Sequence, residues 1–273
     1  MRLKNILLAA GMAGMIYLTP GSVRAQDFDE NVPRELIVSP EVGNVGIYDL
    51  NLKINMTIGA EGKKASSSMR AAVVLEARVD EKDGDDIIFG FDYIRCRASV
   101  RANVDGESAD REIDYDRNDK KSADREDYQQ FIGHKTFSLT KGEYMTKKIG
   151  NLWPTKAIRK GDSWKSEIPI EMDVPSEYED NYDLPIVLRH EGKDSYDGKN
   201  VIRVSIKPGE VDRERRERQN LDFSVSGKFF YDPNTRMIEF LDMGYETSMV
   251  FSARREIPKI KFNADAHIEF KRH

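Results

Sequence analysis

The sequence has 273 residues, with 43 basic and 48 acidic side chains and a single cysteine, Cys96. This length is sufficient to bury a sizeable core, while a single cysteine excludes an intramolecular disulfide. The excess of acidic groups argues against nonspecific nucleic-acid binding, which needs cations to displace the counterions of phosphates.

The N-terminus has the pattern of a secretory signal peptide. Two positive charges precede an apolar run at residues 6–18, which is shorter than the ~20 residues of a membrane-spanning helix. Pro20 interrupts the helix, and Val23-Arg24-Ala25 places small or slender residues where a signal peptidase cleaves. We therefore expect cleavage near Ala25 and export to the periplasm or the extracellular space. No cysteine lies near this point, so we expect a released protein rather than a lipid-anchored one.

Removal of residues 1–25 leaves residues 26–273, which we expect to form a single β-rich domain, with an alternative division near residues 150–154. Their net charge is −8, because the removed segment contains three basic and no acidic side chains. No later apolar run is long enough to predict a transmembrane helix.

Apolar and polar residues alternate over long stretches, which is typical of strands with one buried and one solvated face. The first two such stretches are residues 48–58 and 69–79. Asp83-Gly84 predicts a hairpin turn before a third strand at residues 87–100. In that strand the apolar positions change from odd to even near Tyr93-Ile94, which predicts a β-bulge. Cys96 falls in this alternation, and we expect it to be buried as a small hydrophobe.

Polar residues dominate from 105 to 126, where we expect only a brief strand at 113–115 and a short helix with Ser122 as its N-cap. The charge-rich segment at 208–220 predicts a solvated helical crossover. Alternation and turn signals, including Asp197-Gly198, predict further strands at 137–139, 144–149, 168–172, 185–189, 201–206, 221–231, 237–251 and 260–270.

The sequence thus predicts an all-β fold with at most short helices. Parallel sheets need long crossovers that are usually helical, and most of the predicted connections are of hairpin length. We expect about ten strands in an antiparallel sheet that is curved into an open half-barrel.

Three segments resemble an uncharacterised family of exported bacterial β-rich proteins. They are Phe137-Ser138-Leu139 with Gly142, Trp153-Pro154 with Ile158-Arg159-Lys160-Gly161-Asp162-Ser163-Trp164, and Gly227 with Phe229-Phe230-Tyr231-Asp232-Pro233-Asn234-Thr235-Arg236-Met237-Ile238. The resemblance covers about residues 48–251 and implies a fold like the half-barrels of lipoprotein carriers and related periplasmic lipid-handling proteins. Arg236 stands where the family has a glycine, which implies a different turn geometry. No catalytic residues are implied by this resemblance.

The sequence contains no Gly-x-Ser-x-Gly elbow, phosphate loop or zinc motif. The histidines are scattered, and we expect each at the surface. They are His134, His190, His267 and His273. Asp83, Asp85 and Asp86 lack the glutamate that completes a calcium loop, so we expect a solvated hairpin tip. We predict no catalytic residue, no metal and no cofactor.

Four aromatic residues are candidates for ligand contacts. Trp153 and Trp164 flank a connection that contains Pro and Gly, where they could clamp a ligand or plug the open end of the core, and we favour the plug. Tyr178 and Tyr182 lie in an acidic segment that could bind Ca²⁺ or a sugar, and we favour a plain acidic loop.

These features favour a non-enzymatic binding or structural protein of the cell envelope, which holds a lipid, an acyl chain or an apolar partner on a concave sheet face. One alternative is an envelope or extracellular hydrolase with carboxylates from separate strands. The other is an adhesion or assembly module that donates an edge strand such as residues 260–270.

Overall fold

The computed structural model describes residues 27–36, 43, 45–60, 62–83, 86–119, 136–140, 153–168, 184–251 and 259–273. These residues form an open, curved antiparallel sheet with one short helix, so the predicted all-β fold is confirmed. The predicted signal peptide, the predicted helix at Ser122 and the predicted strand at 144–149 lie outside the described residues.

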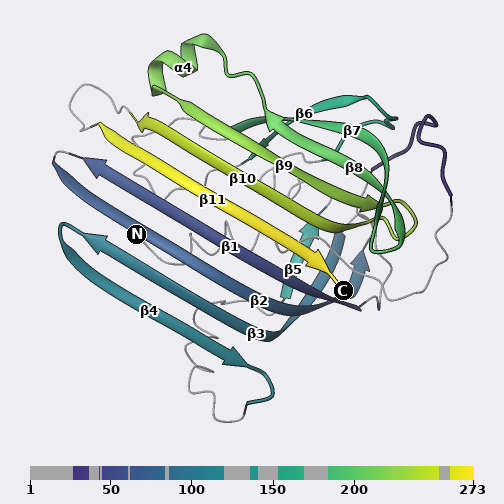
Figure 1. Cartoon of the computed structure of the whole chain (residues 1–273), viewed down its shortest axis with the longest axis horizontal. Coiled ribbons are helices and arrows are strands. Elements are labelled where there is room, and N and C mark those ends of the chain that lie inside the picture. Colours follow the sequence, from purple (N-terminus) through teal and green to yellow (C-terminus); the bar gives the residue numbers. More distant parts are fainter. Residues whose placement is uncertain are drawn as a thin grey trace.

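Eleven strands and one helix make up the described chain, and Figure 1 shows the long strands lying side by side. They are β1 (Val45–Ala60), β2 (Lys63–Asp83), β3 (Asp86–Val104), β4 (Glu107–Asp116), β5 (Thr136–Thr140), β6 (Ser163–Ile168), β7 (Leu184–Tyr196), β8 (Lys199–Pro208), α4 (Arg213–Gln219), β9 (Asp222–Asp232), β10 (Met237–Phe251) and β11 (Ile260–Arg272).

The sheet consists of two sets of consecutive strands that are joined at its centre. Its order is β4-β3-β2-β1-β11-β10-β9-β8-β7-β6, and β5 pairs with β3 outside this path. The central pairing joins strands from opposite ends of the sequence, since Leu52 of β1 lies opposite Ile268 of β11. On its other side, Leu52 lies opposite Ala71 of β2.

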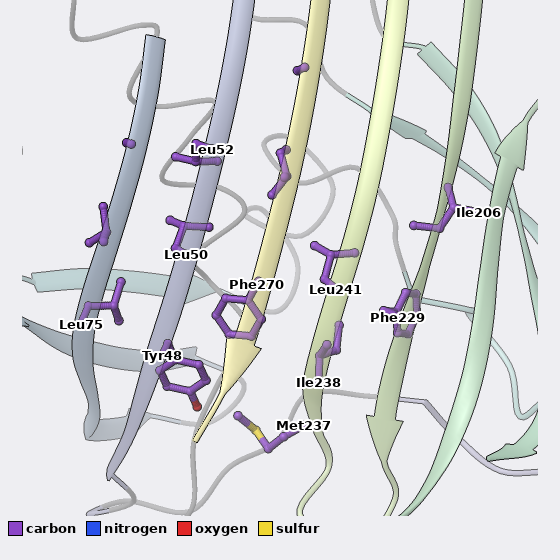
Figure 2. Close-up of a cluster of buried hydrophobic side chains, with 14 of the residues drawn as sticks. Tyr48, Leu50, Leu52, Leu75, Ile206, Phe229, Met237, Ile238, Leu241 and Phe270 are labelled. Atoms are coloured by element: carbon purple, nitrogen blue, oxygen red, sulfur yellow. The ribbon is translucent and has the colours of Figure 1, made fainter. Parts of the chain in front are cut away.

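One face of this sheet is buried because the apolar residues of neighbouring strands are in register. In β11, every second residue from Phe262 to Phe270 is buried, while Asn263 and His267 on the other face are exposed. Figure 2 shows side chains of β1, β11, β10 and β9 gathered in one layer, including Leu50, Phe270 and Leu241. Burial of each such side chain contributes roughly 1.5–3 kcal/mol, and the alternation therefore fixes the register.

The predicted bulge near Tyr93-Ile94 is confirmed. The register with β2 shifts there, because Val74 pairs with Arg95 whereas Leu75 pairs with Tyr93. The bulge separates two parts of β3: the later part pairs with β4 and the earlier part pairs with β5, which lies behind the main sheet in Figure 1. A bulge bends a strand and increases its twist, so β3 is able to contribute to both pairings.

The prediction of only a brief strand at 113–115 is wrong, because β4 has ten residues. Its first six residues are exposed, and only Ile113 and Tyr115 are buried in the core. The strand is held at the edge of the sheet by pairing with β3 rather than by a buried face, so its alternation is weak. Arg97 and Asp114 form one of the ion pairs across this edge, with Nε 3.3 Å from Oδ1.

Turns and the crossover agree largely with the sequence. Asp197 and Gly198 both have positive φ, as the predicted hairpin turn between β7 and β8 requires. Helix α4 lies in the predicted crossover at 208–220; it has seven residues, and none of the described helices could span a bilayer. The expectation of a different turn geometry at Arg236 is wrong in this respect: its φ of 56° is the conformation that glycine favours, so the backbone stays glycine-like despite the different residue.

Candidate functional site

The apolar face of the sheet is a candidate binding surface, and its main cluster of described side chains is buried in this structure. Its main cluster extends from Ile113 on β4 through Leu52 and Ile268 at the centre to Ile206 and Leu188 on β8 and β7. Four small residues, Ala71, Ala98, Ala264 and Ala266, interrupt the larger side chains on this face. The surface is therefore apolar over the whole width of the sheet.

One end of this face is incompletely covered. A second cluster there contains Leu184, Leu221, Met249, Phe262 and Ala264. Apolar residues that are only partly buried surround it, and we call them the part-exposed patch. They are Met56, Ile58, Ile168, Val211, Phe223, Tyr245 and Ile260. Contiguous apolar side chains that remain accessible to solvent are typical of ligand or partner sites.

Met56 of β1 links the two clusters, because it packs against both of them. Its neighbour Thr57 points to the polar face of the same strand, where it lines a cavity with Asn55 and Asp265. This alternation places an apolar surface and a polar surface on the two sides of one strand.

The opposite end of the apolar face contains a buried ionic cluster. Arg272 Nη1 lies 2.5 Å from Oε1 of Glu239, and Lys199 Nζ lies 2.6 Å from Oε2 of the same carboxylate. The side chains of Arg272 and Glu239 are 3% and 1% exposed, so the pair is removed from solvent. Burial raises the pKa of the adjacent Tyr48 hydroxyl well above its usual value, while Arg272 opposes that shift. The sequence alone did not reveal this cluster, because its members are far apart in the chain.

Trp153 plugs the core. It is 8% exposed, and its ring meets those of Phe229 and Tyr231 at centroid distances of 5.8 Å. Trp164 in β6 is partly buried and packs against the main cluster. The two tryptophans therefore both contribute to packing, whereas the candidates Tyr178 and Tyr182 lie outside the described residues.

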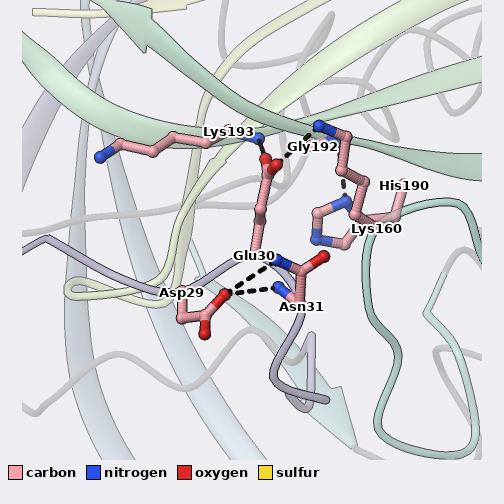
Figure 3. Close-up of polar contacts among 7 residues, drawn as sticks. All are labelled: Asp29, Glu30, Asn31, Lys160, His190, Gly192 and Lys193. Atoms are coloured by element: carbon pink, nitrogen blue, oxygen red, sulfur yellow. Dashed lines mark hydrogen bonds and ion pairs between the residues drawn. The ribbon is translucent and has the colours of Figure 1, made fainter.

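The segment at 27–36 is fastened to the sheet by polar contacts, which Figure 3 shows. Glu30 accepts hydrogen bonds from Lys160 Nζ at 2.6 Å and from the Lys193 backbone N–H at 2.7 Å. The Lys160 hydrogen bond is the main cause of the lowered pKa of the Glu30 carboxyl. Arg34 and Ile158 exchange two backbone hydrogen bonds of 2.8 Å, which bring the segment beside the Trp153 region. This segment therefore covers part of the apolar edge with Phe28 and Leu36, both buried.

His190 is buried rather than at the surface, so the sequence-based expectation for this histidine is wrong. Its Nδ1 accepts a hydrogen bond of 3.0 Å from the Gly192 backbone N–H (Figure 3). The register of β7 with β8 shifts between His190 and Gly192, which leaves Glu191 as the extra residue of a bulge. Burial lowers the pKa of the imidazole. The ring is thus a packing and hydrogen-bonding element of the β7 bulge.

The remaining histidines and Cys96 agree with the sequence where they are described. His267 and His273 are exposed, with His267 Nε2 3.6 Å from Asp242 Oδ1. Cys96 is buried, and burial raises its thiol pKa to about 11. His134 lies outside the described residues. Among the described residues, no group of three or more His, Cys, Asp or Glu side chains is arranged to hold a metal ion.

Two open cavities lie on the sheet, and most of their lining residues belong to its polar face. The first has a volume of about 480 Å³ and spans β1 to β4 together with His267 of β11. The second has a volume of about 450 Å³ and spans β1, β11, β10 and β9, with Asp222, Glu246 and Asp265 among its lining residues. These cavities were not anticipated, because cross-strand neighbours cannot be assigned before the register is known.

No family model and no curated protein matches the chain. Among solved structures, a structure titled for lipid–protein interactions in lipovitellin aligns with 86% of this chain at 8% identity and a TM-score of 0.43. This chain spans 25% of the lipovitellin chain. A DUF1329 family protein from Desulfovibrio piger aligns with 82% of this chain and 83% of its own length, at 12% identity and a TM-score of 0.15.

Proposed function

We propose that this protein is an exported, non-enzymatic binding protein that holds a lipid or another molecule with an acyl chain against the apolar face of its sheet. The observation that carries this proposal is the continuous apolar face with a part-exposed end. A ligand of this class gains affinity mainly from the removal of apolar surface from water, and it needs no catalytic group.

The part-exposed patch is the proposed entry to the apolar face. Met56, Phe223 and Tyr245 come from three different strands, and each is partly buried against a cluster of fully buried side chains. An acyl chain that contacts these residues would extend the apolar contacts of the buried side chains behind them. The proposed export is supported by the charged start, the short apolar run and the Val-x-Ala ending of residues 1–25.

The strand-donation alternative loses its candidate strand. Residues 260–270 belong to β11, which pairs with β1 on one side and with β10 on the other. A strand with two partners in the same sheet has no free edge to donate. The described residues therefore contradict the use of this segment as an edge strand.

The hydrolase alternative requires carboxylates from separate strands in one cleft. Glu246 and Asp265 lie opposite each other on β10 and β11 and line the second cavity with Asp222. A glycosidase acid, however, is normally held in an apolar pocket, whereas Glu246 and Asp222 are exposed on the polar face. This arrangement favours a solvated polar surface, and binding at the apolar face is the better-supported function.

The proposal is tested by titration of the protein, without residues 1–25, with a fluorescent C16 fatty acid. We expect saturable binding that unlabelled fatty acid reverses. Met56→Lys places a charge in the part-exposed patch, and we expect it to weaken binding by about tenfold or more, because the ammonium group must stay hydrated.

Thr57→Lys is the matched control, since it adds the same charge one residue away on the polar face. We expect its affinity for the probe to equal that of the unaltered protein. Circular dichroism checks that both variants fold. Absence of saturable binding, or equal losses in the two variants, would contradict binding at the apolar face.

A further inference from the structure

Charge pairing on the polar face follows a clear pattern at the β3–β4 edge. Arginines of β3 lie opposite aspartates of β4, and each pair forms an ion pair. The Nε–Oδ distances are 3.4 Å for Arg95–Asp116, 3.3 Å for Arg97–Asp114 and 2.9 Å for Arg101–Asp110. Opposite charges in cross-strand positions stabilise a sheet, and this edge therefore has its charges matched.

The centre of the sheet departs from this pattern. Lys53 of β1 lies directly opposite Arg70 of β2 on one side and opposite His267 of β11 on the other. Like charges in directly opposed positions are destabilising, because the side chains start only ~4.5–5.5 Å apart at Cβ. Among the described residues, neither Lys53 nor Arg70 forms an ion pair with an acid, and both are exposed.

The first cavity lies at this row of basic residues. Its lining includes Lys53, Arg70, Arg97 and His267, with Ala72 and Ser99 as small residues between them. Ala72 lies between Asn51 and Arg97 in the register. Its short side chain leaves space beside Lys53, Arg70 and Arg97. Glu112 and Asp114 line the β4 side, where Asp114 already pairs with Arg97.

We infer that this cavity binds a phosphate group through Lys53, Arg70 and Arg97. A phosphate would supply the negative charge that Lys53 and Arg70 lack, whereas His267 already lies 3.6 Å from Asp242. Guanidinium groups bind phosphate oxygens in a bidentate manner, and a lysine adds a compact point charge. The Ser99 hydroxyl is a further hydrogen-bond donor in the lining. This site is on the opposite face of the sheet from the proposed acyl-binding surface, and it does not depend on that function.

The experiment measures binding of two phosphate sources to the protein without residues 1–25. Calorimetric titration with pyrophosphate tests a soluble phosphate. Co-sedimentation with phosphatidylcholine vesicles, with and without phosphatidic acid, tests a lipid headgroup. Binding of pyrophosphate alone assigns the site to soluble phosphates, and binding of phosphatidic acid vesicles alone assigns it to headgroups.

Two variants locate the site. Lys53→Gln with Arg70→Gln removes two charges from the row, and Ala72→Glu places a carboxylate in the cavity without removing any basic residue. We expect each to reduce binding by about tenfold or more, since charge-assisted hydrogen bonds are lost or opposed. Glu112→Gln removes an acid from the lining, and we expect it to strengthen binding.

The matched control is Lys64→Gln with Lys261→Gln. These exposed lysines lie opposite Gly59 on the two sides of β1, six residues along the strand from Lys53, or about 20 Å away. We expect binding to be unchanged in this control. Binding of neither phosphate source, or an equal loss in the control and in the Lys53/Arg70 variant, would overturn the inference.

Discussion

Arg272 donates a hydrogen bond from Nη1 to Oε1 of Glu239 across 2.5 Å, and the two side chains are almost completely buried. A buried charge is tolerated only while its partner is present. We predict that Glu239→Leu lowers the free energy of unfolding by about 3–5 kcal/mol, because Arg272 is left buried and without its carboxylate. Urea denaturation measures this change.

A double variant separates pairing from packing. Glu239→Leu combined with Arg272→Met removes both charges, and we expect it to be more stable than either single variant. If the losses of the two single variants simply add in the double variant, the pair is not coupled, and this interpretation is wrong.

The anchoring of the segment at 27–36 depends on the absence of a side chain at Gly192. This residue has a φ of +116°, and a Cβ there would lie 2.7 Å from Oε2 of Glu30. We predict that Gly192→Ala costs about 1–3 kcal/mol of stability and displaces the segment, which limited proteolysis would detect.

Gly198→Ala is the control for backbone strain. Gly198 also has a positive φ, of +74°, but no atom lies within 4 Å of the place that a Cβ would occupy there. We expect a smaller loss of stability and no new cleavage near the N-terminus. Identical behaviour of the two alanine variants would show that the Glu30 contact is unimportant.

The burial of His190 predicts a loss of stability in mild acid. Its pKa is lowered in the folded protein from the usual value of 6.5, so the unfolded chain binds more protons in this range. The free energy of unfolding should therefore fall as the pH decreases below about 6.5, until the folded pKa is passed. The lowered pKa of Glu30 adds a separate loss at more acidic pH, below its usual value of 4.5. Urea titrations at a series of pH values measure both changes.

His190→Asn should remove the loss of stability below about pH 6.5. The control His267→Asn, which changes an exposed histidine, should leave that loss in place. A pH profile that is unaffected by His190→Asn would mean that another group is responsible for the loss.

Trp153 provides a direct test of packing against ligand contact. We predict that Trp153→Ala lowers the free energy of unfolding by about 3–5 kcal/mol, because the ring fills the space beside Phe229 and Tyr231. Trp164→Ala should cost less, since Trp164 is only partly buried. A stable Trp153→Ala protein with a large loss of fatty-acid affinity would instead identify Trp153 as a ligand clamp.

Much of the fold was predictable because its strands alternate strictly. The pattern at 48–58 indicated the buried face of β1, and the parity change near Tyr93-Ile94 indicated the bulge in β3. Strand β4 was predicted too short, at 113–115, because its pairing satisfies backbone groups at an exposed edge, which leaves little hydrophobic signal in its first six residues. Local alternation indicates which face of a strand is buried, but it carries no information on the neighbouring strand.

The candidate sites were much less predictable for the same reason. Lys53 and Arg70 come into opposition only through the register of β1 and β2, and Glu239 meets Arg272 only through the order of the whole sheet. His190 has the sequence surroundings of an exposed strand end, yet it lies within β7 beside a bulge and is buried. The candidate sites therefore depend on contacts between segments that are distant in the sequence, and local patterns do not reveal such contacts.

Native mass spectrometry of the protein isolated from the envelope fraction of its own cells tests the central claim most directly. We predict a processed protein that begins near Gln26 and carries added mass, which is released on denaturation and identified as a lipid or fatty acid. The same measurement on Met56→Lys should show less added mass than on Thr57→Lys. A protein that retains residues 1–25, or one that carries no lipid in any preparation, would contradict the account.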